Sequence, residues 1–144
     1  MQHPMYKKGF TLIEVLVVLA IIGIIASLAV SSYSDSVQKT RRADGKSAVL
    51  QAAALQERWY AQNQQYTTEI ADIGGATSSE GFYSLTVSNI LSGVTCDDFT
   101  CYTITATAVG AQASDSECGI LSVDNLGRKK SYRLGTTTET QDCW

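Results

Sequence analysis

A long, uninterrupted apolar run near the N-terminus constrains this chain more than any other feature. From Phe10 to Val30 the sequence is FTLIEVLVVLAIIGIIASLAV, in which Glu14 is the only ionisable residue. As an α-helix, this run is about 31 Å long, which matches the hydrocarbon thickness of a bilayer. Lys7 and Lys8 precede it, so the positive-inside rule places the N-terminus in the cytoplasm and the following residues outside. We therefore expect one membrane-spanning helix followed by an exported domain.

Glu14 helps to separate three interpretations of this run. A secretory signal peptide has a shorter apolar region with no carboxylate inside it. A plain membrane anchor explains the length and orientation, but it leaves the carboxylate unexplained, because a charged group near the bilayer centre costs about 2.5–3.5 kcal/mol. The third interpretation depends on the residues around Glu14.

The residues from Lys7 to Glu14, KKGFTLIE, resemble the processing signature of type IV pilins and type II secretion pseudopilins. In that family a prepilin peptidase cuts after the glycine and methylates the new N-terminal residue. The resemblance implies a leader at residues 1–9, cleavage after Gly9 and N-methylation of Phe10. It also implies that Phe10 and Glu14 take part in filament assembly. Our hypothesis is that the Glu14 carboxylate pairs with the new amine of Phe10, preferably that of a neighbouring subunit.

The resemblance continues to the C-terminus and favours a type IVa pilin, particularly a minor pilin of the PilE kind. The segments that carry it are Gly23, Tyr33, residues 55–63, Cys118-Gly119, Asn125-Leu126-Gly127 and Asp142-Cys143-Trp144. Pilins commonly have a proline at the position of Ser31, and its absence here puts the usual helix kink in doubt.

The expected fold class is α+β, the type IV pilin fold, with one helix from about Thr11 to about Gln62. Ala48, Ala52, Leu55 and Trp59 share one helical stripe, which we expect to pack on an antiparallel sheet of about four strands. The candidate strands are residues 83–87, 102–107, 119–123 and 131–134. The expected division is a leader at 1–9, a transmembrane and polymerisation helix at 10–33, and a periplasmic or extracellular globular domain at 34–144.

Four cysteines lie in the exported part of the chain, where an even number indicates two disulfides. The sequence allows three pairings. We favour Cys96–Cys101 and Cys118–Cys143, the second of which resembles the disulfide-bounded C-terminal region of pilins. A zinc site with four thiolates is the alternative, but paired Cys-x-x-Cys elements are absent from the sequence.

The remaining candidates for a functional site are charged clusters. The basic residues that we single out for contact with DNA or another partner are Arg128, Lys129, Lys130 and Arg133. Against DNA binding stands the formal net charge of −3 for the 144 residues. Carboxylates at Asp115, Glu117 and Asp124 match no calcium-loop spacing. The only histidine is His3, which excludes most catalytic designs built on histidine.

We therefore expect a structural pilus subunit, not an enzyme, with no cofactor and no metal. Its filaments would serve motility, adhesion or DNA uptake; the alternatives are a tip-located binding pilin and a secretion pseudopilin. The expected partners are other pilin subunits, the prepilin peptidase, the inner-membrane assembly platform and, before assembly, membrane lipid. The chain would lie in the inner membrane as a single-pass protein and then in the extracellular filament.

Overall fold

The computed structural model describes residues 9–144, and for residues 28–32 it describes the backbone only. The expected leader, apart from Gly9, lies outside these residues. The chain divides into two compact units with the boundary between Val37 and Gln38. We call residues 38–144 the head and describe the two units separately. Helix α1 runs from Leu12 to Asn63, within one residue of the expected bounds.

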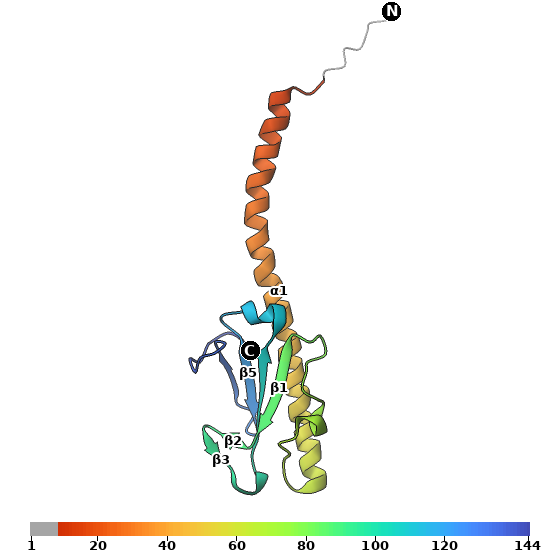
Figure 1. Cartoon of the computed structure of the whole chain (residues 1–144), viewed down its shortest axis with the longest axis vertical. Coiled ribbons are helices and arrows are strands. Elements are labelled where there is room, and N and C mark those ends of the chain that lie inside the picture. Colours follow the sequence, from red (N-terminus) through yellow and green to blue (C-terminus); the bar gives the residue numbers. More distant parts are fainter. Residues whose placement is uncertain (1–8) are drawn as a thin grey trace, which may run out of the picture. The chain divides into compact units, whose positions relative to one another are not determined.

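The head contains a four-stranded antiparallel sheet in the order β1-β4-β5-β6 (Figure 1). Its strands are β1 (Tyr83–Ser88), β4 (Thr103–Ala108), β5 (Ile120–Asp124) and β6 (Lys129–Tyr132). A separate hairpin pairs β2 (Ile90–Leu91) with β3 (Val94–Thr95). Short 3₁₀ helices are η1 (Ile70–Ile73), η2 (Asp97–Phe99) and η3 (Gly110–Ser114). The α+β fold expected from the sequence is confirmed.

One face of the sheet packs on the second half of α1 and forms the core of the head. Tyr83, Ile104 and Leu121 point to this inner face and are fully buried, together with Val49 and Ala52 of the helix. Between them along each strand come residues of the outer face, which α1 does not cover (Figure 1). The alternation in the sequence therefore separates a core-facing set of side chains from a solvent-facing set.

The buried stripe of α1 differs from the expected one by one position. Ala52 is buried as predicted, and Ala48 and Leu55 are half-buried and pack against the core, as was expected; Trp59 is also half-buried. The centre of the contact is instead Gly45, Val49, Ala52 and Gln56. Sequence reasoning missed this stripe because it contains a glycine and a polar side chain.

Gln56 lies in the core because it completes the hydrogen bonds of a neighbouring loop. Its Nε2 donates to the carbonyl of Thr67 (2.6 Å), and its Oε1 accepts the backbone N–H of the same residue (3.1 Å). The side chain thus replaces a strand partner for that peptide group, so its burial leaves neither amide atom unpaired.

Strand β6 begins two residues earlier than predicted, at Lys129 instead of Ser131. The turn before it is shorter than expected because the Asp124 carboxylate accepts the backbone N–H groups of Leu126 and Arg128 (3.0 Å each). Gly127 takes a positive φ of 71° in this turn. The chain can therefore re-enter the sheet at once, which places Lys129 and Lys130 in a strand.

Both disulfides join the pairs that we favoured. Cys96–Cys101 closes a short loop around η2, and Cys118–Cys143 ties the C-terminus to a residue two positions before β5. Cys118 and Cys143 are each 1% exposed. The larger loop, with a sequence separation of 25, restricts the unfolded chain, which stabilises the head by about 3 kcal/mol in the chain-entropy model.

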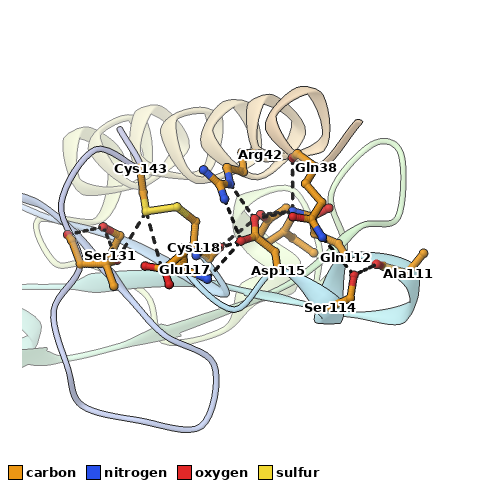
Figure 2. A network of polar contacts seen from close by, with 12 residues as sticks. Gln38, Arg42, Ala111, Gln112, Ser114, Asp115, Glu117, Cys118, Ser131 and Cys143 are labelled. Carbon is orange, nitrogen blue, oxygen red and sulfur yellow. Dashed lines mark hydrogen bonds and ion pairs between the residues drawn. A yellow bond between two sulfur atoms is a disulfide. The ribbon is translucent and has the colours of Figure 1, made fainter. Parts of the chain in front are cut away.

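A buried ion pair joins α1 to the loop between β4 and β5 (Figure 2). Arg42 donates from Nε and Nη2 to the two carboxylate oxygens of Asp115 (2.6 and 2.8 Å). The same carboxylate, 1% exposed, also accepts the Gln112 amide and the backbone N–H of Cys118. Burial alone raises the pKa of Asp115, but these hydrogen bonds outweigh it and the pKa is lowered.

The sign of this pKa shift predicts a loss of stability in acid. Because the folded pKa is lowered, the contribution of Asp115 is complete above the unfolded pKa of about 3.9 and is lost as the pH falls through the folded value. We expect Asp115→Asn to cost about 3–5 kcal/mol at pH 7 and less at pH 3, as measured by urea unfolding of the full chain in non-ionic detergent. Glu117→Gln, which removes an exposed pair with Arg133, is the control and should change stability by at most about 0.5 kcal/mol. A cost of Asp115→Asn that is equal at both pH values would contradict this account.

The close approach of α1 to the sheet predicts that Gly45 cannot be replaced without cost. A Cβ at this position would lie 2.8 Å from Cδ2 and Cε2 of the buried Tyr83 ring. The gain in helix propensity on Gly45→Ala, about 1 kcal/mol, is therefore outweighed, and we expect a net loss of about 1–2 kcal/mol in the free energy of unfolding. Gly23→Ala is the matched control, since a Cβ there meets nothing within 4 Å. Unfolding of the head at the same urea concentration in both variants would show that the contact is looser than described.

Candidate functional site

The N-terminal unit presents apolar side chains on all sides of its helix. The large ones, from Phe10 to Ile25, have exposed fractions between 49% and 91%. Among the described residues, no helical stretch is both long and apolar enough to cross a membrane. A helix that is apolar all round is stable only when lipid or protein surrounds it, and a surface of this extent indicates an interaction site.

Thr11 and Glu14 form a capping box at the start of α1. The Glu14 Oε2 atom accepts the backbone N–H of Thr11 (2.9 Å) and its hydroxyl (2.8 Å), while the N–H of Glu14 donates to Oγ1 of Thr11 (3.3 Å). This is the Ser/Thr-x-x-Glu pattern that satisfies unpaired N–H groups at a helix N-terminus. Sequence reasoning considered a charge partner for Glu14, or a position at the membrane interface, and missed the cap, although the Thr-x-x-Glu spacing was visible. The pairing of Glu14 with a Phe10 amine remains a hypothesis, because that amine exists only after cleavage.

A second candidate site lies on the outer face of the sheet, where a hollow of about 450 Å³ opens between the sheet and the β2–β3 hairpin. Its lining is mostly hydroxyl-bearing, with charged residues at one side: Ser88, Ser92, Thr103, Thr105, Ser122, Tyr132, Asp124, Arg128 and Lys130, together with Ile90 and Gly93. The hairpin forms because Ser92 and Gly93 both take a positive φ (52° and 84°), as a tight two-residue turn requires. We did not predict this hairpin, although Ser-Gly between short apolar stretches is a turn signal.

The four basic residues singled out in the sequence do not form one cluster. Arg128 and Lys130 line the hollow. Lys129, one residue along β6, points to the other face, where its Nζ lies 5.3 Å from the centre of the Trp144 ring. Arg133 follows the strand and donates to the Glu117 carboxylate (2.9 Å).

The two basic residues of the hollow also have carboxylate partners. Arg128 donates from Nε to Asp124 (2.7 Å) and from Nη2 to the Ser92 hydroxyl (3.2 Å), so it connects the β5–β6 turn to the hairpin. The ion pair of Lys130 with Glu139 is longer (3.7 Å), and both side chains are about half exposed, at 43% and 52%. Lys130 is therefore the less firmly held of the two cations.

The carboxylates considered for calcium are separated in the structure. Asp115, Glu117 and Asp124 each pair with a different arginine. Among the side chains that the structure describes, no group of three or more His, Cys, Asp or Glu residues could hold a metal ion.

Comparison with known sequence families gives two matches. Residues 4–30 match the prokaryotic N-terminal methylation motif. Residues 31–122, more than half of the chain, match the family described as type IV minor pilin ComP, DNA uptake sequence receptor.

Two relatives agree with these matches in sequence. The type IV major alpha-pilin of Moraxella bovis is 32% identical over 143 residues, which cover 94% of this chain and 79% of that protein. The type IV major fimbrial protein FimA of Dichelobacter nodosus is 49% identical over 41 residues, which cover 28% of this chain and 26% of that protein. A solved type IV pilin structure from Shewanella oneidensis aligns with a TM-score of 0.49 and 23% identity over 74% of this chain and 97% of that one.

The family match over residues 31–122 and the similarity to the Moraxella bovis pilin over nearly the whole chain lead to one conclusion. This chain belongs to the type IV pilins, in the minor pilin family ComP, and is a pilus subunit that assembles with other pilin subunits.

Proposed function

We propose that this chain enters the inner membrane as a prepilin and joins the filament through its N-terminal helix. In this proposal residues 1–9 are a leader that is cleaved after Gly9, Phe10 is N-methylated, residues 10–33 form the polymerisation helix, and residues 34–144 form the exported domain. The observation that carries the proposal is the band of exposed apolar side chains between Phe10 and Ile25, which lies within the match to the methylation motif. Such a helix can exchange lipid for the equivalent helices of other subunits without entering water.

The partners follow from this path. The prepilin peptidase must reach the Gly9–Phe10 bond on the cytoplasmic side, and the assembly platform must extract the helix from the lipid. The protein is then a single-pass inner-membrane protein before assembly and part of an extracellular filament afterwards. Its role is structural and not enzymatic.

Glu14 has the chemistry to select the assembled state. Its Oε2 atom is occupied by the cap with Thr11. A carboxylate has a second oxygen with its own lone pairs, so it can keep the cap and accept an ammonium group as well. Cleavage creates such a group at Phe10, and in an apolar environment the unpaired charges would be costly. Pairing between neighbouring subunits therefore favours assembly over the isolated subunit.

We expect Glu14→Ala to remove this protein from filaments while leaving its processing intact. Because the carboxylate would pair with the neighbour's amine, its loss should lower immunogold labelling along sheared pili at least about tenfold, which corresponds to one ion pair in apolar surroundings. Mass spectrometry of the N-terminus separates failed assembly from failed cleavage. Thr11→Ser, which keeps the capping hydroxyl, is the matched control and should assemble normally. Normal labelling of the Glu14→Ala protein would remove the pairing hypothesis.

A second function, binding of double-stranded DNA by the head, is favoured by one specific observation. The residues of the head that match the DNA uptake sequence receptor family include most of the outer sheet face, next to which Lys130 and Arg128 lie. We propose that this pilin contacts DNA there during uptake, despite the acidic balance of the chain. Local cations beside a groove can bind phosphates when the rest of the surface repels them weakly at physiological salt.

The opposite directions of Lys129 and Lys130 allow a sharp test of DNA binding. The probe is a fluorescent 24-base-pair duplex of mixed sequence, titrated with the full chain in non-ionic detergent. Lys130→Gln should weaken binding and reduce the slope of log K against log salt by about 1, because one phosphate contact is lost. The matched control is Lys129→Gln. Because Lys129 points to the other face of the sheet, toward the Trp144 ring, this change should leave the slope unchanged. No binding by the unmodified chain at 0.15 M salt would exclude this second function and leave the structural role intact.

A further inference from the structure

The outer face of the sheet carries an unusual concentration of hydroxyl groups. On the outer face of three neighbouring strands lie seven serines and threonines: Ser84, Thr86 and Ser88 on β1, Thr103, Thr105 and Thr107 on β4, and Ser122 on β5, which is buried (7% exposed). The strand register places these groups side by side, since Thr105 is opposite Thr86 on one side and opposite Ser122 on the other. Ser122 is in turn opposite Lys130.

Part of this array forms the floor of the hollow beneath the β2–β3 hairpin. Thr105, Ser122 and Lys130 lie in one row across three strands, and all three line the hollow. Tyr132 continues the same face of β6. Helix α1 does not cover this face, because it lies against the opposite side of the sheet (Figure 1).

The hydroxyl groups that line the hollow differ in whether they already form hydrogen bonds within the protein. Thr103 donates to the carbonyl of Ile90 and so holds the hairpin in place. Ser122 makes only a long contact with the carbonyl of Lys130 (3.5 Å). Within the described part of the chain, no hydrogen-bond partner is recorded for the hydroxyl of Thr105 or of Tyr132. These two groups are available as donors to a ligand.

Charge decides which ligand suits this surface. Lys130 is half exposed and only loosely paired with Glu139, so an incoming anion can displace that carboxylate. Arg128 donates hydrogen bonds to Asp124 and Ser92. Its role is therefore to connect the β5–β6 turn to the hairpin at the edge of the hollow. Hydroxyl donors in a row beside one exchangeable ammonium fit the non-bridging oxygens of phosphate groups, which are bound in proteins by Ser, Thr, Tyr and Lys side chains.

We propose that this row, from Thr105 through Ser122 to Lys130, is a seat for the backbone phosphates of duplex DNA. The inference deepens the DNA-binding function proposed above and rests on it. Thr105 and Tyr132 donate hydrogen bonds to phosphate oxygens, and Lys130 supplies the positive charge. Such contacts fix the position of the duplex without reading its sequence, so discrimination between sequences must come from other residues.

The isosteric change Thr105→Val tests the seat, because it removes the hydroxyl and keeps the β-branched shape. In the titration of the full chain with the mixed-sequence 24-base-pair duplex, we expect affinity to fall at least about tenfold, as for a lost hydrogen bond to a charged acceptor. The salt slope should not change, since no cation is removed. Thr107→Val is the matched control, because Thr107 lies on the same face of β4 but outside the hollow, and it should bind like the unmodified chain.

Two further probes identify what the hydroxyl recognises. A duplex with uncharged methylphosphonate linkages should bind far more weakly to the unmodified chain and should be insensitive to Thr105→Val. Inorganic phosphate at the same total phosphate concentration should compete poorly; full competition would show that the seat takes free phosphate and not the DNA backbone, and would overturn the proposal.

The outcomes distinguish this inference from the function on which it rests. If the unmodified chain binds no duplex, the DNA-binding function itself fails. If it binds and Lys130→Gln weakens it, but Thr105→Val and Thr107→Val have equal effects, the function stands and the hydroxyl seat is wrong. Far-ultraviolet circular dichroism of both valine variants shows whether the head is still folded.

Discussion

The requirement that an all-round apolar helix be kept out of water governs the rest of this molecule. The large apolar side chains between Phe10 and Ile25 are exposed, and their contact with water is unfavourable. They lie on all sides of the helix, so the helix cannot bury them by turning one face away from water. Two environments satisfy such a helix, lipid and surrounding protein. In the proposed assembly path the subunit moves between these two environments. The start of the helix, where Thr11 and Glu14 form the capping box, would then differ between them in whether the Glu14 carboxylate also pairs with an amine.

The head is stabilised by contacts among its own residues. A close helix–sheet contact, a buried ion pair and a disulfide stand out among them. The backbone of α1 approaches Tyr83 at Gly45, so a large aromatic ring fills the space that a longer side chain would occupy. The Arg42–Asp115 pair then fixes the helix to the β4–β5 loop, and the adjacent disulfide from Cys118 fixes the same loop to the C-terminus (Figure 2). The backbone N–H of Cys118 also donates to the Asp115 carboxylate. The ion pair and the disulfide therefore restrain the same short segment, from Asp115 to Cys118.

Most of this architecture was predictable from local patterns, and the errors have physical causes. The helix bounds, the α+β class and the central strands follow from periodicity, which is strong wherever one face is buried. The buried stripe on α1 was misplaced because Gly45 and Gln56 are not apolar; only the tertiary contacts with Tyr83 and with the Thr67 peptide group show why they are inside. The start of β6 was missed because the Asp124 side chain, not the backbone alone, closes the preceding turn. The division of the basic residues between two faces follows from the same start, because it places Lys129 and Lys130 in the strand, where successive side chains point to opposite faces.

The distribution of carboxylates limits what the basic residues of the head can do. Arg42, Arg128 and Arg133 each hold an acidic partner within 2.9 Å, so these guanidinium groups are committed to the fold and contribute little net charge to the surface. An anionic polymer that approaches the sheet therefore meets mainly Lys130 and neutral hydroxyls. Binding through neutral donors depends less on salt than binding through cations, because fewer counterions are released for the same number of contacts. A chain with an acidic balance can in this way hold a polyanion on one face while its other surfaces repel it, which confines the ligand to the outer side of the sheet.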